Sequence, residues 1–383
     1  GWGNDNQANI PTTTALFTST GKNVDVVIVD GCIDPGHPEF AANENGTGGS
    51  RVQQFNWFDL NPAVTGGAVA TYLYTNNGNG DYTVGGGQED DNNHGVHVAG
   101  TACGNRRGWA RDANIYNINP YSSAPSTISD TLIIDYIREW HNTKDVNTET
   151  GKRNPTVTNH SYGSGVDITI SNIEWINYRG VQYNSPTAQQ CTDFGLVNNG
   201  TTVLDMPIWS TATQADINDA VNDGIIFIAA AGNSSFKTDV STGIDYNNQV
   251  KESGYAADYY HRGGDPASLN GVISVGAISE LQSDEKANYS NCGPRVNVYA
   301  PGTNIISSVL SGGVTDMRNT SYRVKKYPGT SMASPRVAGV VAWLAEHWPR
   351  LTQDEVVAYF NSLNPYMQTH LATLGQIGNA GSD

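Results

Sequence analysis

Basic residues are scarce in this sequence. Lys and Arg number 21 against 37 Asp and Glu, which gives a formal net charge of −16. A chain of this charge repels the phosphates of nucleic acids and anionic membrane surfaces, so we expect neither as a partner. Long apolar runs are also missing. The longest covers residues 225–231, far below the roughly 20 residues of a membrane span, and we therefore expect none.

Cysteine is rare as well, and its residues stand at Cys32, Cys103, Cys191 and Cys292. No two of them form a C-x-x-C pair, which argues against a zinc site of that kind. The sequence does not choose among the disulfide pairings, or between disulfides and free thiols. The chain begins at Gly1 without a methionine or a signal peptide, so we interpret it as a mature or trimmed product.

Glycine, by contrast, is abundant at 42 residues, and 38% of the chain is hydrophobic. Short apolar runs alternate with helical patterns, which predicts an α/β fold with a mostly parallel central sheet and helices on both faces, in three layers. Strands are predicted at residues 24–30, 113–118, 156–159, 225–230, 272–275 and 296–300. Helices are predicted at residues 94–103, 132–140 and 215–223, and two more begin near Ser331 and Thr352. Thr352 and Glu355 can form a capping box.

No Pro-rich or Ser-rich linker divides the sequence, so we expect residues 1–383 to form a single domain. Three stretches do not fit the alternation of strands and helices: residues 59–93, 166–210 and 234–262. We interpret them as long surface insertions, which often carry specificity.

One serine stands at the start of a predicted helix, in Gly329-Thr-Ser331-Met-Ala-Ser-Pro335. A serine in that place is most often a helix cap. Two upstream residues favour another role, because Asp30 ends a predicted strand and His94 opens a predicted helix. Carboxylate, imidazole and hydroxyl in this chain order are the components of a serine hydrolase, in which the base activates the hydroxyl and the acid orients the base.

Asn233 follows the strand predicted at residues 225–230. Its amide could donate a hydrogen bond to an oxyanion, together with the backbone N–H of Ser331 at the helix start. Asn233 could equally be only a turn residue after a strand, and these residues alone leave both interpretations open.

These segments resemble the signatures of the subtilisin-like serine proteases, the subtilase family. The similar blocks are Val-Ile-Val-Asp30-Gly-Cys-Ile-Asp34, His94-Gly-Val-His-Val-Ala-Gly-Thr101, Ala229-Ala-Ala-Gly-Asn233, Tyr299-Ala-Pro-Gly302 and the Ser331 block, in family order. The resemblance implies a subtilisin-like fold and a serine endopeptidase that hydrolyses peptide bonds through an acyl-enzyme on Ser331.

The resemblance also implies the site residues. The catalytic residues would be Asp30, His94 and Ser331, with Asn233 as the oxyanion donor. Two short segments would bind the substrate. One would pair with the substrate backbone as an added strand, and it consists of Ser161, Tyr162 and Gly163. The other would form a wall of the pocket for the residue before the cut, and it consists of Ala230, Ala231 and Gly232. Residues 166–210 follow directly on the first segment, so we expect them to rim the site.

A protein or peptide substrate, an N-terminal pro-segment during maturation, a monomeric state and secretion follow from the same resemblance. No organic cofactor is implied. Structural Ca²⁺ occurs in the family, although the loop after His94 that often binds it is missing here. Residues 81–93 are rich in acidic side chains among glycines; such a loop can hold calcium but is more often only solvated. The position of any metal therefore stays open.

The sequence departs from the family pattern at several positions. Gly31 and Cys32 stand where Ser or Thr and then Gly are usual, so we expect Asp30 to lack one hydroxyl partner. Val96 replaces the usual Thr, and Arg336 stands where His is common. None of these changes removes a catalytic atom.

Other features have alternative functional interpretations. His94-x-x-His97 has the spacing of metal ligands on adjacent helix turns, but His97 is better interpreted as a packed structural histidine. Asp34 could pair with Asp30 as in a glycoside hydrolase, but it fits a turn better. Asp265 lies near the expected pocket floor and could select a basic substrate residue, but we favour a surface turn.

Two other functions remain open from the sequence alone. One is a binding or structural protein on a retained protease fold, against which the intact triad argues. The other is an esterase or a peptide ligase that uses the same nucleophile.

Overall fold

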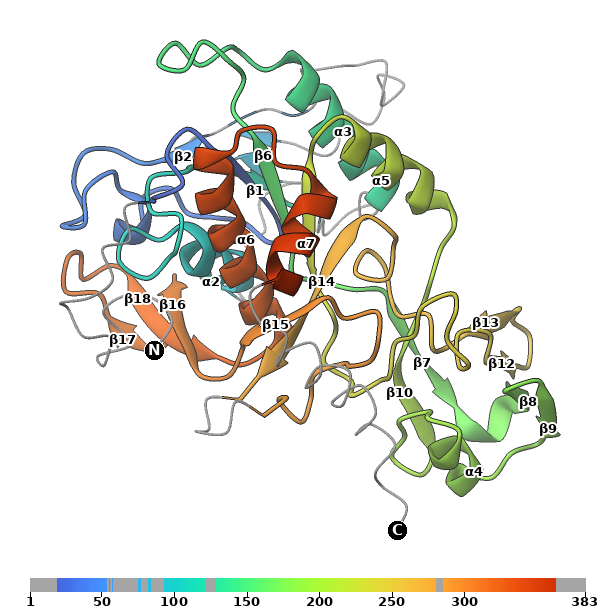
Figure 1. Ribbon diagram of the computed structural model, residues 1–383. Coiled ribbons are helices and arrows are strands. Elements are labelled where there is room, and N and C mark those ends of the chain that lie inside the picture. Colours follow the sequence, from blue (N-terminus) through green and yellow to red (C-terminus); the bar gives the residue numbers. More distant parts are fainter. Residues whose placement is uncertain are drawn as a thin grey trace.

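A parallel sheet forms the centre of the molecule (Figure 1). The structure, a computed structural model, describes residues 19–53, 55, 57, 75–76, 82–83, 93–120, 129–279 and 285–362. The 7-stranded sheet has the order β15-β14-β11-β6-β1-β5-β2, and its neighbours run parallel. Its strands are β1 (Asp25–Val29), β2 (Val52–Gln53), β5 (Asn114–Ile118), β6 (Thr156–His160), β11 (Ile226–Ala230), β14 (Val272–Ile278) and β15 (Val298–Pro301). Every strand predicted from the sequence is in this sheet.

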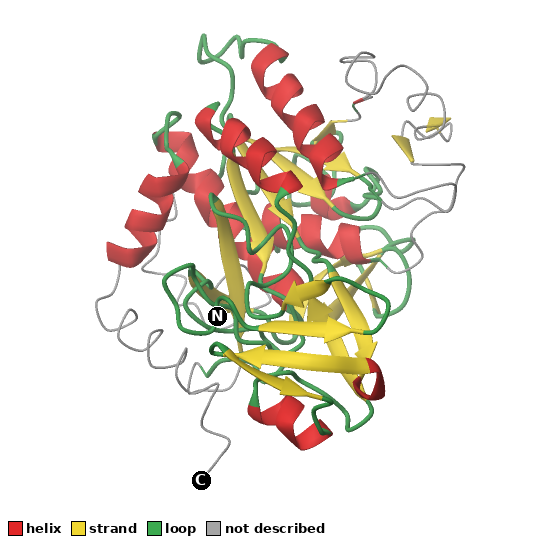
Figure 2. Cartoon of the chain, turned by 90° about the vertical axis from the view of Figure 1, so that its right-hand side faces the viewer, coloured by secondary structure: helices red, strands yellow, loops and turns green. Residues whose placement is uncertain are grey.

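Helices cover both faces of the sheet (Figures 1 and 2). One face packs against α2 (His94–Cys103), α6 (Thr330–His347) and α7 (Gln353–Ser362), and the other against α3 (Asp130–Thr143) and α5 (Ala212–Asn222). The predicted helices are therefore confirmed. The capping box before α7 is also confirmed, since the Thr352 N–H donates to Glu355 at 2.8 Å and the Glu355 N–H donates to Thr352 Oγ1 at 3.3 Å.

The three layers follow from the alternation of side chains along each strand. In β1, Val26 and Ile28 join the apolar core beneath α2 and α6. Val27 and Val29, which point the other way, join the core beneath α3 and α5. Each such fully buried side chain contributes about 1.5–3 kcal/mol of transfer free energy. The predicted three-layer α/β fold is confirmed.

Two of the expected insertions pack together beside the central sheet, at the lower right of Figure 1. Strand β12, from residues 234–262, pairs with β8, from residues 166–210. They share a core that contains Ile176, Val203 and Phe236. The elements are β7 (Gly165–Thr169), η3 (Ile170–Asn172), β8 (Ile173–Tyr178), β9 (Val181–Asn184), α4 (Ala188–Asp193), β10 (Thr202–Pro207), β12 (Gln249–Glu252) and β13 (Ala257–Tyr259).

Residues 59–93, the first expected insertion, lie outside the described residues apart from β3 (Thr75–Asn76), β4 (Tyr82–Thr83) and Asn93. A further antiparallel sheet, β16 (Ile305–Val309), β18 (Arg323–Tyr327) and β17 (Val314–Thr315), was not predicted and packs beside α2. No helix in the described part of the chain has the length and apolarity to cross a membrane.

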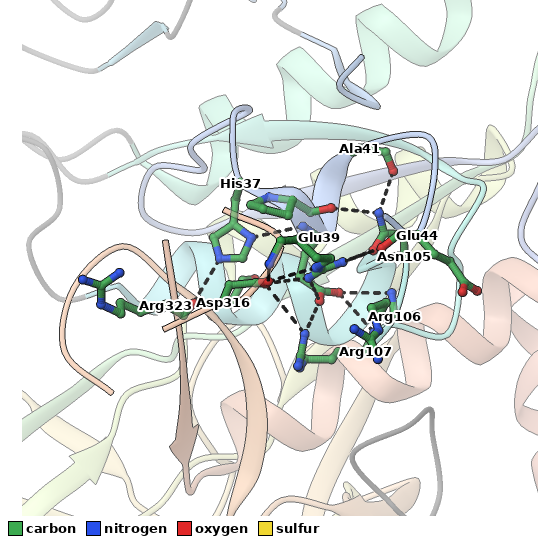
Figure 3. Close-up of polar contacts among 12 residues, drawn as sticks. His37, Glu39, Ala41, Glu44, Asn105, Arg106, Arg107, Asp316 and Arg323 are labelled. Atoms are coloured by element: carbon green, nitrogen blue, oxygen red, sulfur yellow. Dashed lines mark hydrogen bonds and ion pairs between the residues drawn. The ribbon is translucent and has the colours of Figure 1, made fainter. Parts of the chain in front are cut away.

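A buried carboxylate links the segment after β1 to the residues between β17 and β18 and to the end of α2 (Figure 3). Glu39, in the short helix η1 (Pro38–Phe40), has no exposed surface. Its carboxylate accepts hydrogen bonds from the side chains of Arg107 and Arg318 and from the backbone of Arg106 and Arg107. Because the ion is both paired and fully hydrogen-bonded, its burial is tolerated, whereas removal of one partner would leave a buried charge.

Three buried histidines and one half-buried histidine link stability to pH. Burial lowers the pKa of His97 and His160 to about 3, and that of His141 and His261 to about 4. In the unfolded chain these rings protonate near pH 6.5. Below about pH 6.5 the unfolded state therefore binds more protons than the folded state, and the free energy of unfolding falls as the pH falls.

We accordingly predict that stability declines steadily from about pH 6.5 toward pH 4, as measured by guanidinium unfolding at a series of pH values. The variant His160→Gln should reduce the slope of the free energy of unfolding against pH by about 1.4 kcal/mol per pH unit, which corresponds to one proton. A free energy of unfolding that stays constant over this window would contradict the neutral, buried state of these rings.

Candidate active site

Three neighbouring strands end at one level of the central sheet. In the register of β1, β6 and β11, His160 stands beside both Val29 and Ala229. The next residues, Asp30 and Ser161, therefore leave the sheet about one strand spacing apart, near 4.8 Å. In open α/β sheets, functional groups gather at the carboxyl ends of the strands.

Asp30 and His94 form a close pair at this edge. The Oδ1 atom of Asp30 lies 2.8 Å from Nδ1 of His94, the first residue of α2. Asp30 is buried, at 1% exposure, whereas the imidazole keeps 32% of its surface exposed. Because a carboxylate accepts at Nδ1, that nitrogen carries the proton and Nε2 keeps its lone pair. This is the arrangement that a general base needs.

A glycine permits this close approach of α2 to the strand end. A Cβ atom on Gly95 would lie 2.1 Å from the backbone oxygen of Gly31, a separation that no side chain tolerates. The first turn of α2 therefore rests directly on the backbone that follows Asp30. This packing fixes the position from which the His94 ring reaches the carboxylate.

The second carboxylate oxygen of Asp30 has no hydrogen-bond partner within the described residues, although it is buried. Oδ1 accepts from the Gly31 N–H at 2.8 Å as well as from His94. The expectation that Gly31 deprives Asp30 of a hydroxyl partner is thus confirmed. A buried unpaired oxygen of this kind costs about 1–3 kcal/mol.

Ser331 is the second residue of α6, and it is not a cap. The N-cap position is Gly329, whose φ of 145° is a conformation that favours glycine. The Ser331 hydroxyl donates to the Ser161 carbonyl at 3.0 Å, and the Ser161 hydroxyl donates to the Ser331 carbonyl at 3.0 Å. These reciprocal bonds hold the start of α6 against the end of β6.

Within the described residues, the Ser331 hydroxyl bonds to Ser161 and not to His94. The structure thus joins Asp30 to His94 and Ser331 to Ser161 as two pairs at adjacent strand ends. A change of χ1 between staggered positions would redirect the hydroxyl away from Ser161.

Asn233 lies beside the start of α6. Its Oδ1 accepts from the backbone N–H of Thr330 at 2.8 Å and from the Thr330 hydroxyl at 3.0 Å. Those two donors fix which end of the amide is oxygen. Neither Asn233 Nδ2 nor the Ser331 N–H has an acceptor in the described part of the chain. Two donors next to a helix N-terminus can stabilise a negative oxygen.

A cavity of about 120 Å³ adjoins Ser331 and Asn233. This volume suits one side chain, since drug-sized ligands need about 300–1,000 Å³. Two segments line the cavity, and they include all the predicted substrate-binding residues except Ser161: Tyr162, Gly163, Ala230, Ala231 and Gly232. Ser161 does not line the cavity, but it contacts Ser331 directly.

Asp205 also lines this cavity, although no sequence pattern pointed to it. It comes with Pro207 from residues 166–210, which we expected to rim the site. Asp265, by contrast, does not line the cavity; it lies in a turn, as predicted, but at 3% exposure the turn is buried, so the predicted surface location is wrong. Its carboxylate accepts from the Ser210 N–H and the Ser268 hydroxyl, and burial raises its pKa to about 6.

The remaining alternatives concern metals and turns. His97 is fully buried and its Nε2 lies 2.9 Å from the carbonyl of Ile305, as expected for a packed histidine. Asp34 accepts from the Gly36 N–H at 2.7 Å, which confirms a turn. Among the described residues, no group of three or more His, Cys, Asp or Glu side chains could hold a metal ion. The acidic loop at residues 81–93 lies outside them, apart from Tyr82, Thr83 and Asn93.

No disulfide joins any of the four cysteines, all of which belong to the described part of the chain. Cys103, Cys191 and Cys292 are buried, and burial raises the pKa of Cys103 to about 12 and of Cys191 to about 11. Cys32 is half-buried, two residues after Asp30, and its sulfur lies 3.0 Å from Nδ2 of Asn119.

We predict that one thiol per chain, Cys32, reacts with Ellman's reagent in the native protein, because thiolates need solvent access to react. All four should react in guanidinium without a reductant. The variant Cys32→Ser should lose the native reaction and keep the other three thiols. Two or fewer reactive thiols in the unreduced, unfolded wild type would reveal a disulfide.

Known proteins match both this sequence and this fold. Alkaline proteinase of Hapsidospora chrysogena is 27% identical over 299 residues, which are 78% of this chain and 52% of that protein. Subtilisin E of Bacillus subtilis (strain 168) is 27% identical over 354 residues, 91% of this chain and 62% of that protein. The chain thus spans between half and two thirds of the length of these relatives.

The fold is similar to that of a cold adapted subtilisin-like serine proteinase, with a TM-score of 0.53, 22% sequence identity, and coverage of 92% of this chain and 87% of the other. The sequence model of the subtilase family, peptidase family S8, matches residues 21–372, which is most of the chain. This chain therefore belongs to the subtilase family.

Proposed function

We propose that this protein is a serine endopeptidase that cleaves peptide bonds through an acyl-enzyme on Ser331. The observation that carries the proposal is the hydrogen-bonded pair of Asp30 and His94 at the same sheet edge as Ser331. Membership of the subtilase family, and relatives named alkaline proteinase and subtilisin, support the same reaction.

The proposed reaction begins when the Ser331 hydroxyl turns from the Ser161 carbonyl toward Nε2 of His94. Its oxygen attacks the carbonyl carbon of the substrate while its proton passes to Nε2. Asp30 holds the Nδ1–H of His94 and stabilises the imidazolium that forms. Nδ2 of Asn233 and the Ser331 N–H donate to the resulting oxyanion.

His94 then returns the proton to the leaving amine, the carbon–nitrogen bond breaks, and the acyl group stays on Ser331. Water attacks this ester with His94 again acting as the base, which releases the acid and restores the hydroxyl. Every proton moves between groups of this chain, the substrate and water, so the chemistry requires no metal and no organic cofactor.

The substrate fits the site as an added strand. Ser161, Tyr162 and Gly163 follow β6 at the strand end, where a peptide backbone can pair with them. The side chain before the cut would then enter the cavity between Tyr162 and Ala230. Burial of that one side chain would orient the carbonyl toward Ser331, which is how remote binding contributes to rate.

We further propose that the protein is secreted, acts as a monomer and is made with an N-terminal pro-segment that maturation removes. Its net charge of −16 agrees with a soluble extracellular protein. Family membership favours a protein or peptide substrate.

Replacing the nucleophile should remove activity and leave the fold intact. We predict that Ser331→Ala lowers kcat on a fluorogenic peptide by about 10⁶, a magnitude known for this family, and lowers stability by only about 1 kcal/mol through loss of the hydrogen bond to the Ser161 carbonyl. A matched control is Ser334→Ala, three residues further along α6, because the Ser334 hydroxyl donates to Asn159 at 2.6 Å. That variant should lose about 1–3 kcal/mol of stability and keep turnover within several-fold. Near wild-type turnover in Ser331→Ala would defeat the assignment.

Removing the oxyanion donor should affect the transition state more than the bound substrate. We predict that Asn233→Ala lowers kcat by about 10²–10³, a magnitude that also comes from this family, and changes KM little. Steady-state kinetics on the same peptide separate the two parameters. An effect confined to KM would contradict the proposed role of Asn233.

A further inference from the structure

We propose that Asp205 makes this protein selective for a basic residue, Lys or Arg, immediately before the cleaved bond. The inference rests on the proposed function and deepens it, because it names the substrate class of the same site. It concerns only the cavity beside Ser331, in which Asp205 is the one charged side chain among the described lining residues.

The lining of the cavity matches the two parts of a basic side chain. Ala230, Ala231 and Pro207 offer apolar surface to the methylene stem of Lys or Arg. The exposed carboxylate of Asp205 offers an acceptor to the cationic group at the end of that stem. The volume of about 120 Å³ is of the order of one such side chain.

The carboxylate of Asp205 has no cationic partner in the described part of the chain. Its Oδ2 accepts from the Ser234 hydroxyl at 2.5 Å, and its backbone N–H donates to Asp167. The neighbouring Asp167 is therefore a second negative group on the adjacent strand β7. An unneutralised carboxylate near a partly enclosed cavity attracts a cation more strongly than one in open water.

Irregular backbone directs Asp205 toward the cavity. The pairing of β10 with β7 shifts register between Val203 and Met206, which is a β-bulge, and Asp205 lies inside it with φ of 46°. Bulges re-aim a side chain and are frequent next to active sites. Across the pair, a Cβ on Gly165 would lie 2.3 Å from Oδ1 of Asp205, so the glycine leaves room for the carboxylate.

The variant Asp205→Asn tests the charge without disturbing the backbone. Asn and Asp are, after glycine, the residues that best tolerate a left-handed conformation, and the amide oxygen can still accept from Ser234. The matched control is Asp193→Asn, in α4, which removes the same charge from an exposed position outside the cavity. Melting temperatures would verify that both variants fold.

The experiment compares quenched fluorogenic peptides that differ only at the residue before the cleaved bond: Lys, Arg, norleucine or Glu. We expect the wild type to cleave the Lys and Arg peptides with a kcat/KM about tenfold above that for the norleucine peptide. This is the effect that a charge-assisted hydrogen bond has in a partly solvated site. Asp205→Asn should abolish this difference by lowering kcat/KM for the Lys and Arg peptides to the value for the norleucine peptide. Asp193→Asn should behave as the wild type. Added salt should reduce the ratio of kcat/KM for the Lys and Arg peptides to that for the norleucine peptide, because salt screens the attraction between charges.

Equal cleavage of the Lys and norleucine peptides by the wild type would overturn the inference, as would a basic preference that survives in Asp205→Asn. Both results leave Ser331-dependent cleavage of the norleucine peptide intact, and so leave the proposed function standing. If the wild type cleaves none of the peptides at any position, the proposed function and the inference fail together.

Discussion

The common register of β1, β6 and β11 is the constraint on which the site depends. Because the three strands are parallel and aligned, Asp30, Ser161 and Ala230 lie at one level, at the carboxyl ends of the strands. Two helices then dock onto this edge. Gly95 lets α2 rest on the backbone after Asp30, and the reciprocal bonds of Ser331 with Ser161 hold the start of α6. An acid, a base and a hydroxyl that are distant in sequence thus lie at neighbouring strand ends.

Much of this arrangement could be predicted from the sequence, because it depends on local patterns. Strands buried on both faces read as continuous apolar runs, so the central sheet was predictable almost strand for strand. The helix that begins at His94 has the predicted bounds. The unpaired oxygen of Asp30 was also predictable, since Gly31 has no hydroxyl to offer. The order of the strands and the present orientation of the Ser331 hydroxyl are not local properties, and no sequence pattern specified them.

The features that the sequence did not reveal depend on contacts between distant segments. Asp205 reaches the cavity only because a bulge in β10, paired with β7, turns it there. Asp265 can be buried because Ser210 and Ser268 donate hydrogen bonds to its carboxylate. Its charge alone had favoured an exposed turn. Pairing of β8 with β12 joins two insertions that looked independent. In each case, a partner far along the chain decides the environment of the residue.

The most direct test of the account is to map, by mass spectrometry, where a fluorophosphonate reagent attaches. Such a reagent reacts with a serine whose hydroxyl is activated by a neighbouring base. We predict one adduct on the peptide that contains Ser331, and loss of that adduct in His94→Ala. An adduct at another residue, or equal labelling of Ser331 in His94→Ala, would contradict the claim that the sheet edge assembles one catalytic unit.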